Sequence, residues 1–193
     1  MFENESWAGD VVYLDNPEDI WAYDTTEPGD GAPGKPGEIR WCYAELNSGV
    51  KVLQKRRLTR LALLLGASVV KGSYLELGTG SYFVADALAP ANMPLTDAAG
   101  FVSEEVNREG KGSVAQGVLP TGYWFWAVVE GPCDVITDAA VAVDTPMIPK
   151  AATGAGRLDD TAPAGLEHTI CGRFLEAGGA PATSVEALVK LGF

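Results

Sequence analysis

One stretch of the chain, residues 117–132 (GVLPTGYWFWAVVEGP), limits the possible folds more than any other. It contains a turn signal at 120–122, an unbroken apolar run at 123–129, and a second turn signal at Gly131-Pro132. A short apolar run that is rich in aromatic and β-branched residues and bounded by turn residues predicts one β-strand. Because both faces of this strand are apolar, we expect both to be covered, and we expect the strand to end before Gly131.

The first half of this predicted strand concentrates the aromatic residues Tyr123, Trp124, Phe125 and Trp126. Large aromatic side chains bury roughly 150–250 Å² each, so they dominate whatever surface they cover. The simpler interpretation is a central strand in a β core. The alternative is an oligomer interface on one face, because closed symmetric assemblies are a common way to bury surplus apolar surface.

Turn-forming residues are unusually frequent, with 23 glycines and 12 prolines in 193 residues. Many turns and short elements favour β over α structure. The sequence therefore predicts a mainly β protein, with a single antiparallel sandwich or barrel-like domain over residues 39–193. Residues 25–38 (TTEPGDGAPGKPGE) are too rich in proline and glycine for a helix or a central strand.

Residues 1–38 are accordingly predicted to form an extended N-terminal arm that ends in a Pro/Gly linker. Trp7, Trp21 and Tyr23 are its aromatic anchors. An arm without a core of its own packs on something else, which is either its own domain or a neighbouring subunit.

Several other segments carry local predictions. Alternation over 39–45 predicts a strand, followed by a turn at 47–49, and alternation over 184–191 favours a strand over a capped helix. The segment 50–65 fits either a helix or two short strands, and residues 55–65 are the strongest helix candidate. Polar and turn-rich composition predicts an exposed excursion at 92–112 and a mobile loop at 151–165.

The net charge of −12 disfavours binding to nucleic acid or to an anionic membrane. The first ten residues are acidic and do not resemble a signal peptide, and the longest apolar run, 61–65, is far too short to span a membrane. Three cysteines without a CxxC pair indicate reduced thiols of a protein made in a cytosol. With one histidine, His168, and no nucleophile–base pair or metal-ligand cluster, we expect no cofactor and no catalysis.

Positive charge is clustered in one place only. Between residues 51 and 60 the chain has five basic residues and no acid: Lys51, Lys55, Arg56, Arg57 and Arg60. One interpretation is a solvated face, and the other is a docking patch for an acidic partner surface.

Residues 75–81 (LELGTGS) resemble the first motif of Rossmann-type methyltransferases, with Glu76, Gly78 and Gly80 in place and Tyr82 at the third glycine position. Such a loop binds S-adenosylmethionine only where a strand leads in and a helix leads out. The apolar run that follows ends at Pro90, too early for a good helix, so a β-turn is the favoured interpretation and the methyltransferase the alternative.

The second half of the chain has glycines and apolar residues in a recognisable order. It contains Gly117, Val118, Gly122, Tyr123, Val128 and Gly131, then Thr153, Gly154, Gly156 and Arg157, then ICGRFLEA at 170–177, and closes with Val185, Val189 and Leu191. With Asn47-Ser48-Gly49-Val50 and Lys55-Arg56-Arg57-Leu58 at its opening, this order resembles the capsid decoration, or cement, proteins of tailed bacteriophages.

The resemblance implies a non-enzymatic virion structural protein, made in the host cytoplasm, that binds the outer surface of the capsid and stabilises it. Its implied partners are the major capsid protein and further copies of itself, often in a homotrimer. On this hypothesis the basic cluster lies on the shell-facing side, and the arm with Trp7 and Trp21 reaches over a neighbouring subunit. A receptor-binding or other virion protein of the same β class is a further alternative.

Overall fold

The computed structural model describes residues 13–14, 35–62, 69–78, 84–102, 118–119, 124–150, 155–161, 165, 167–179 and 183–192. The mainly β class is confirmed: the helical elements within these ranges are two short 3₁₀ turns, η2 (Leu95–Asp97) and η3 (Glu167–Thr169). None of the described helices is long and apolar enough to cross a membrane. The predicted anchors Trp7, Trp21 and Tyr23 lie outside the described residues.

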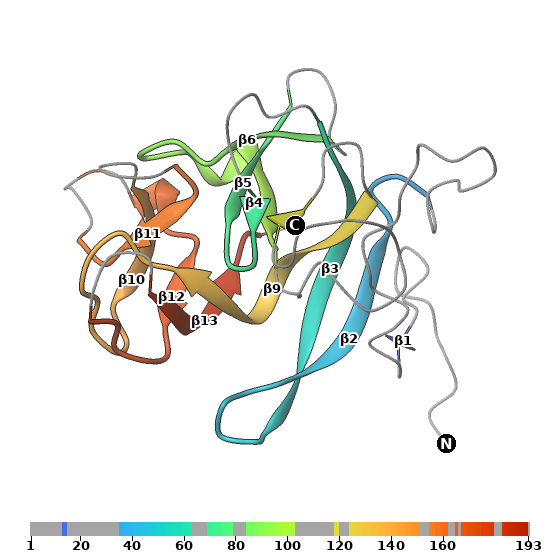
Figure 1. Ribbon diagram of the computed structural model, residues 1–193. Coiled ribbons are helices and arrows are strands. Elements are labelled where there is room, and N and C mark those ends of the chain that lie inside the picture. The colour runs from blue at the N-terminus through green and yellow to red at the C-terminus, as the bar shows by residue number, and fades with distance from the viewer. Residues whose placement is uncertain are drawn as a thin grey trace.

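The strands are distributed along the whole described chain (Figure 1). They are β1 (Tyr13–Leu14), β2 (Ile39–Glu45), β3 (Lys51–Leu61), β4 (Val69–Val70), β5 (Tyr74–Leu77), β6 (Val84–Leu88), β7 (Ala98–Phe101), β8 (Val118–Leu119), β9 (Trp124–Ile136), β10 (Pro146–Lys150), β11 (Arg157–Asp159), β12 (Gly172–Phe174) and β13 (Ser184–Lys190).

Strand β9 joins two parts of one sheet. Its first half, residues 124–128, pairs with residues 56–60 of β3, and its second half pairs with β13, which continues into β12, β10 and β11. Strands β3, β6, β5, β7 and β9 pair in a closed ring, so this part of the molecule is a small barrel. In Figure 1 the yellow β9 runs from the barrel into the orange sheet of β10–β13.

The sheet is mixed and not purely antiparallel, because β3 pairs with β6 in parallel, as does β1 with β2. The β3–β6 pairing has a geometric reason. Neighbours in a ring with an odd number of strands cannot all alternate in direction, so at least one pair must run parallel. This pairing depends on barrel closure, which local sequence patterns do not report.

Two clusters of buried side chains lie on opposite faces of the shared strands. One receives residues from every strand of the ring, including Leu61, Leu75 and Phe125, and fills the barrel. The other lies between the barrel wall and the β10–β13 sheet, and there the rings of Tyr74 and Phe101 stack at a centroid distance of 4.3 Å. Strand β9 is therefore covered on both faces, as predicted.

The prediction that this strand ends before Gly131 is wrong, since β9 continues to Ile136. Gly131 has φ +103°, and a Cβ there would lie 2.7 Å from the carbonyl oxygen of Leu53, so the glycine serves a close approach of β3. Pro132 lies opposite Leu188 of β13. The backbone N–H of Lys190 donates to the carbonyl of Cys171, which comes just before β12 and lies on the side of β13 away from β9. Because alternate residues of a strand point their N–H groups to the same side, the N–H of Leu188 also points away from β9. Leu188 and Pro132 are therefore a pair that exchanges no backbone hydrogen bonds, and the missing N–H of Pro132 costs no bond to β13.

Neither of the two structures predicted for the segment 50–65, a helix or two short strands, is correct, because residues 51–61 form one long strand. Residues 51–57 bond to β2 on one edge, and residues 56–60 bond to β9 on the other. These sheet hydrogen bonds override the modest helix propensity of the leucines and arginines.

Residues 98–101 lie in the predicted excursion at 92–112, yet they form β7 and are completely buried. Gly100 has φ +133°, and a Cβ there would come within 2.8 Å of the Val128 carbonyl oxygen. The small residues of β7 allow it to lie close against β9, and this close packing explains why a segment with weak strand propensity is a barrel strand.

Strand β2 has the predicted bounds, and β13 is a strand as expected. The turn at 47–49 is confirmed, with Gly49 at φ +80°. The predicted loop at 151–165 contains the short strand β11, because Leu158 pairs with Pro149 of β10 and is fully buried.

Candidate binding surface

The five residues of the predicted basic cluster all lie on β3, but they do not form one patch. Lys51 and Arg60 are exposed and Lys55 is half-buried. Arg56 and Arg57 are only 3% and 7% exposed. The shell-facing role predicted for the two buried arginines is therefore wrong, because their guanidinium groups are enclosed by the protein itself.

Arg57 points into the barrel. It lies opposite Ala127 of β9, which belongs to the cluster that fills the barrel, and its Nη2 donates to the carbonyl oxygens of Ala98 and Ala99, both at 3.0 Å. Burial lowers the pKa of Arg57. The arginine thus tethers β3 to β7 through backbone carbonyls.

Arg56 lies on the opposite face of β3 and donates through Nε to the side-chain oxygen of Gln54. The Gln54 amide in turn donates to the carbonyl of Pro132, at the point where β9 leaves the barrel. These two bonds connect β3 to β9 through Gln54. The role of Arg56 is therefore structural.

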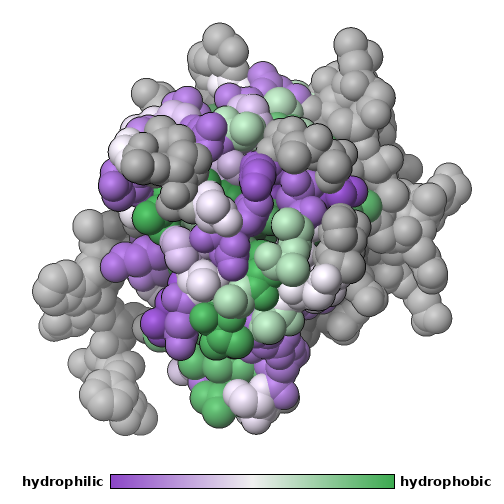
Figure 2. Space-filling model, turned by 90° about the vertical axis from the view of Figure 1, so that its left-hand side faces the viewer, coloured by the Kyte–Doolittle hydropathy of each residue, from purple (hydrophilic) through white to green (hydrophobic). Residues whose placement is uncertain are grey.

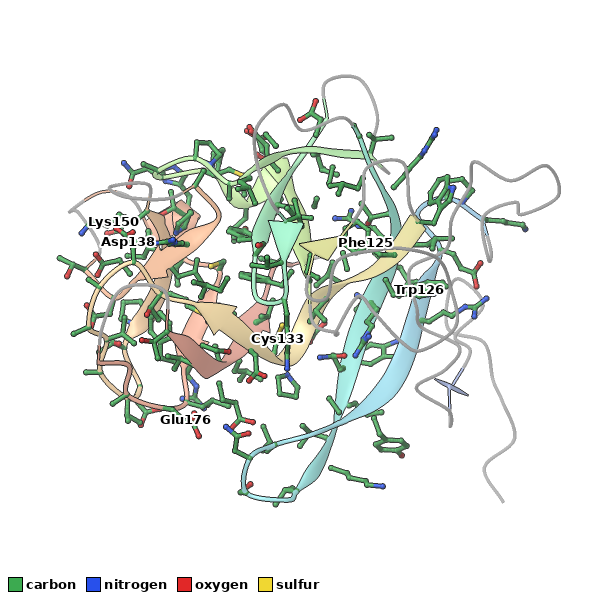
Figure 3. The ribbon with its side chains drawn as sticks, in the orientation of Figure 1. Phe125, Trp126, Cys133, Asp138, Lys150 and Glu176 are labelled. Carbon is green, nitrogen blue, oxygen red and sulfur yellow. The ribbon has the colours of Figure 1, made fainter. Side chains whose placement is uncertain are left out.

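The aromatic residues predicted to form an oligomer interface are mostly covered by their own chain. Phe125 belongs to the barrel cluster, and Trp126 is buried with the guanidinium of Arg40 over its ring at 4.5 Å from the centroid (Figure 3). Trp124 is half-buried, and Tyr123 lies outside the described residues. The interface prediction is wrong for Phe125 and Trp126, because the barrel and the β2 strand already bury the surplus apolar surface.

Exposed apolar side chains gather instead on the hairpin of β2 and β3, which extends below the barrel in Figure 1. Of the large apolar side chains exposed in the described part of the chain, Tyr43, Val50 and Leu53 lie on this hairpin, and only Val143 lies elsewhere. Tyr43 and Leu53 are 56% and 42% exposed and are directly opposite in the strand register. Figure 2 shows hydrophobic residues at the same lower end of the molecule.

On the same face of the hairpin, the residue pairs before and after this one each contain a lysine. Lys55 lies opposite Trp41 with its Nζ 5.7 Å from the ring centroid, and Lys51 lies opposite Glu45. Alternate residues of a strand share a face. We call this face, formed by Trp41, Tyr43, Lys51, Leu53 and Lys55, the hairpin platform.

The hairpin is held at both ends. At its turn, the backbone N–H of Asn47 donates to Glu186 and its side-chain amide donates to Glu176, each at 2.8 Å; Figure 3 shows Glu176 beside this turn. At its base, Gln54 bonds to β9 from the face opposite the platform. The hairpin platform is therefore a fixed surface, on the face of the hairpin opposite the bond between Gln54 and Pro132.

The glycine-rich loop lacks the context of a cofactor site. Gly78 follows β5, and the next element among the described residues is the antiparallel strand β6 and not a helix. Gly80 lies outside the described residues. Burial, and then the charges of Asp86 and Asp97, raise the pKa of Glu76. The sequence motif thus lies between two strands of the barrel, and the β-turn predicted at Gly78-Thr79-Gly80 falls largely outside the described residues.

A separate group of charges lies at the far end of the β10–β13 sheet (Figure 3). Lys150 forms an ion pair with the buried Asp159, and Arg157 lies 3.9 Å from Asp138. Burial alone would raise the pKa of Asp159, but hydrogen bonds from Lys150 and from the Thr161 and Asp160 amides bring it below its usual value. These ion pairs hold β11 against β10 and against the bend that follows β9. No group of potential ligands that could hold a metal occurs among the described residues.

The remaining candidates are structural. Cys133 and Cys171 are buried, and burial raises the pKa of the Cys171 thiol. His168 is exposed on η3, as expected for a surface histidine.

No model of a known protein family matches the sequence, and no curated protein sequence matches it. Among solved structures, the chain is similar to the head fiber gp8.5 N base of bacteriophage phi29, with a TM-score of 0.43 and 13% sequence identity. The match covers 72% of this chain and 95% of that chain. By its description, this neighbour is a phage head fiber protein.

Proposed function

We propose that the chain is a virion structural protein of a tailed bacteriophage that attaches to the outer surface of the head and stabilises the capsid. The observation that carries the proposal is the fixed, projecting β2–β3 hairpin, which turns Tyr43, Val50 and Leu53 toward solvent. Exposed apolar residues gathered in one place and bordered by charges mark protein interaction sites. The sequence order that resembles capsid decoration proteins indicates which kind of partner this surface meets.

The proposed partner is the major capsid protein. A net charge of −12 keeps the chain soluble before assembly and disfavours nucleic acid as a partner. Following the resemblance, we propose a homotrimer on the shell, in which several weak contacts act together. The function is binding and not chemistry, and titration with S-adenosylmethionine is expected to show no micromolar binding.

The direct test compares particles of the encoding phage produced with and without this chain. By electron cryo-microscopy we expect density for the chain on the outside of the head, absent from particles that lack it. We also expect heads without the chain to release their DNA at a lower temperature. Density on the tail would identify a receptor-binding or other tail component, and absence from the particle would refute a virion role.

A further inference from the structure

We propose that the hairpin platform is the docking site itself and that its partner is an acidic protein surface with apolar residues at its centre. This inference rests on the proposed attachment to the phage head and adds the surface and the chemistry of the contact.

The apolar part of the platform has the form of an interaction anchor. Tyr43 and Leu53 lie opposite each other on the paired strands β2 and β3, and Trp41 is the next residue of β2 on the same face. Binding energy in protein interfaces is concentrated in a few such side chains, with aromatic residues over-represented. The bonds of Asn47 to Glu176 and Glu186 fix the hairpin before a partner arrives, so little conformational entropy remains to be lost on docking.

The charges of the platform select the partner. The platform carries Lys51 and Lys55, and the Lys55 Nζ lies 3.9 Å from a carboxylate oxygen of Glu130, in a chain of net charge −12. An acidic surface therefore meets less repulsion at the platform than elsewhere on an acidic molecule. Lys51, which is exposed, is the charge best placed to steer such a surface.

The test measures binding of the purified full chain to shells of the encoding phage that were assembled without it. Tyr43→Ala and Leu53→Ala are expected to weaken binding about tenfold or more. Val143→Ala is the matched control, because Val143 is also an exposed apolar residue, at 52%, but lies away from the hairpin. Since all three side chains are exposed, the melting temperature is expected to stay within a few degrees and shows that each variant is folded.

A second arm tests the charge. Lys51→Glu is expected to slow association several-fold at low salt, with the difference fading as salt is added. Lys35→Glu, at an exposed position before β2, controls for the same change in net charge. If Lys51→Glu and Lys35→Glu slow association equally, the proposal that the partner surface is acidic is wrong.

The outcomes separate this inference from the proposed function. If the unaltered chain does not bind the shells, both fail. If it binds and the Tyr43 and Leu53 variants bind as tightly as the Val143 control, the proposed function stands and the docking site is wrong. If these variants instead convert an oligomer to a monomer in sedimentation, the platform belongs to a second copy of the chain, and the inference is overturned.

Discussion

The two halves of β3 carry the same kinds of residue and use them differently. Within the barrel, Arg57 is buried and donates to backbone carbonyls of β7. In the hairpin, Lys51 is exposed and Leu53, an apolar residue, is 42% exposed. The difference shows that exposure along this strand follows the number of neighbouring layers and not the polarity of the side chain.

The largest effect is expected from removing the buried guanidinium. Arg57→Ala leaves the carbonyls of Ala98 and Ala99 without this donor inside the barrel and should lower the free energy of unfolding by about 3 kcal/mol. Lys51→Ala, on the same strand outside the barrel, should change it by less than about 0.5 kcal/mol. Urea unfolding measures both, and equal effects would refute the division of β3 into two environments.

The next largest effect is expected at Gly131, where β9 passes the junction of the two halves. Gly131→Ala places a methyl group 2.7 Å from the Leu53 carbonyl oxygen in addition to the strain of a positive φ, and should cost about 2–3 kcal/mol. Gly49→Ala, at a positive φ in the hairpin turn but with nothing within 4 Å, should cost about 1 kcal/mol. If the two substitutions prove equally costly in thermal unfolding, the close approach carries no energy of its own.

A smaller effect is expected from releasing the hairpin turn. Asn47→Ala removes the bond to Glu176 and should cost about 1 kcal/mol or less, because the bond is exposed. Its clearer sign is faster hydrogen exchange of the amides at 44–52, with unchanged exchange in β9. Unchanged exchange in the hairpin would mean that the turn is held without Asn47.

The smallest effect is expected at Glu76, at the end of β5 in the barrel wall. Burial and two nearby carboxylates raise its pKa, so the folded state is penalised while Glu76 is ionised. Glu76→Gln should therefore raise stability at neutral pH, and the gain should vanish as pH falls below about 4.3, where the unfolded chain is also protonated.

The measurement is the melting temperature as a function of pH. Glu167→Gln, at an exposed position on η3, removes one negative charge elsewhere and serves as the control. A gain at Glu76 that persists unchanged in acid would show that its ionisation is not the cause.

Part of the fold could be predicted because its causes are local. Alternation with flanking turn residues was enough for the bounds of β2 and for β13 as a strand, and two apolar faces were enough to predict that β9 is covered on both sides. Strand β7 could not be predicted, because Ala98, Ala99 and Gly100 are weak strand formers that become a barrel strand only against β9.

For the candidate surface, the sequence located basic residues on β3 but not which of them reach solvent. Lys51 and Arg60 are exposed, whereas Arg56 and Arg57 are buried, because the groups around these two arginines come from strands distant in the chain. Tyr43 and Leu53 were missed as surface residues, since each fits an apolar strand position.

The sequence by itself determined that this chain is mainly β, that β2, β9 and β13 are strands, and which residues of these strands share a face. Tertiary structure decided which part of β2 meets water. Ile39 and Tyr43 lie on the same face of β2, yet Ile39 is opposite Arg57 at the barrel, and Tyr43 is exposed beyond it. The physical reason is that alternation is set by the backbone of one strand, whereas burial requires a second layer, and that layer ends where the barrel closes.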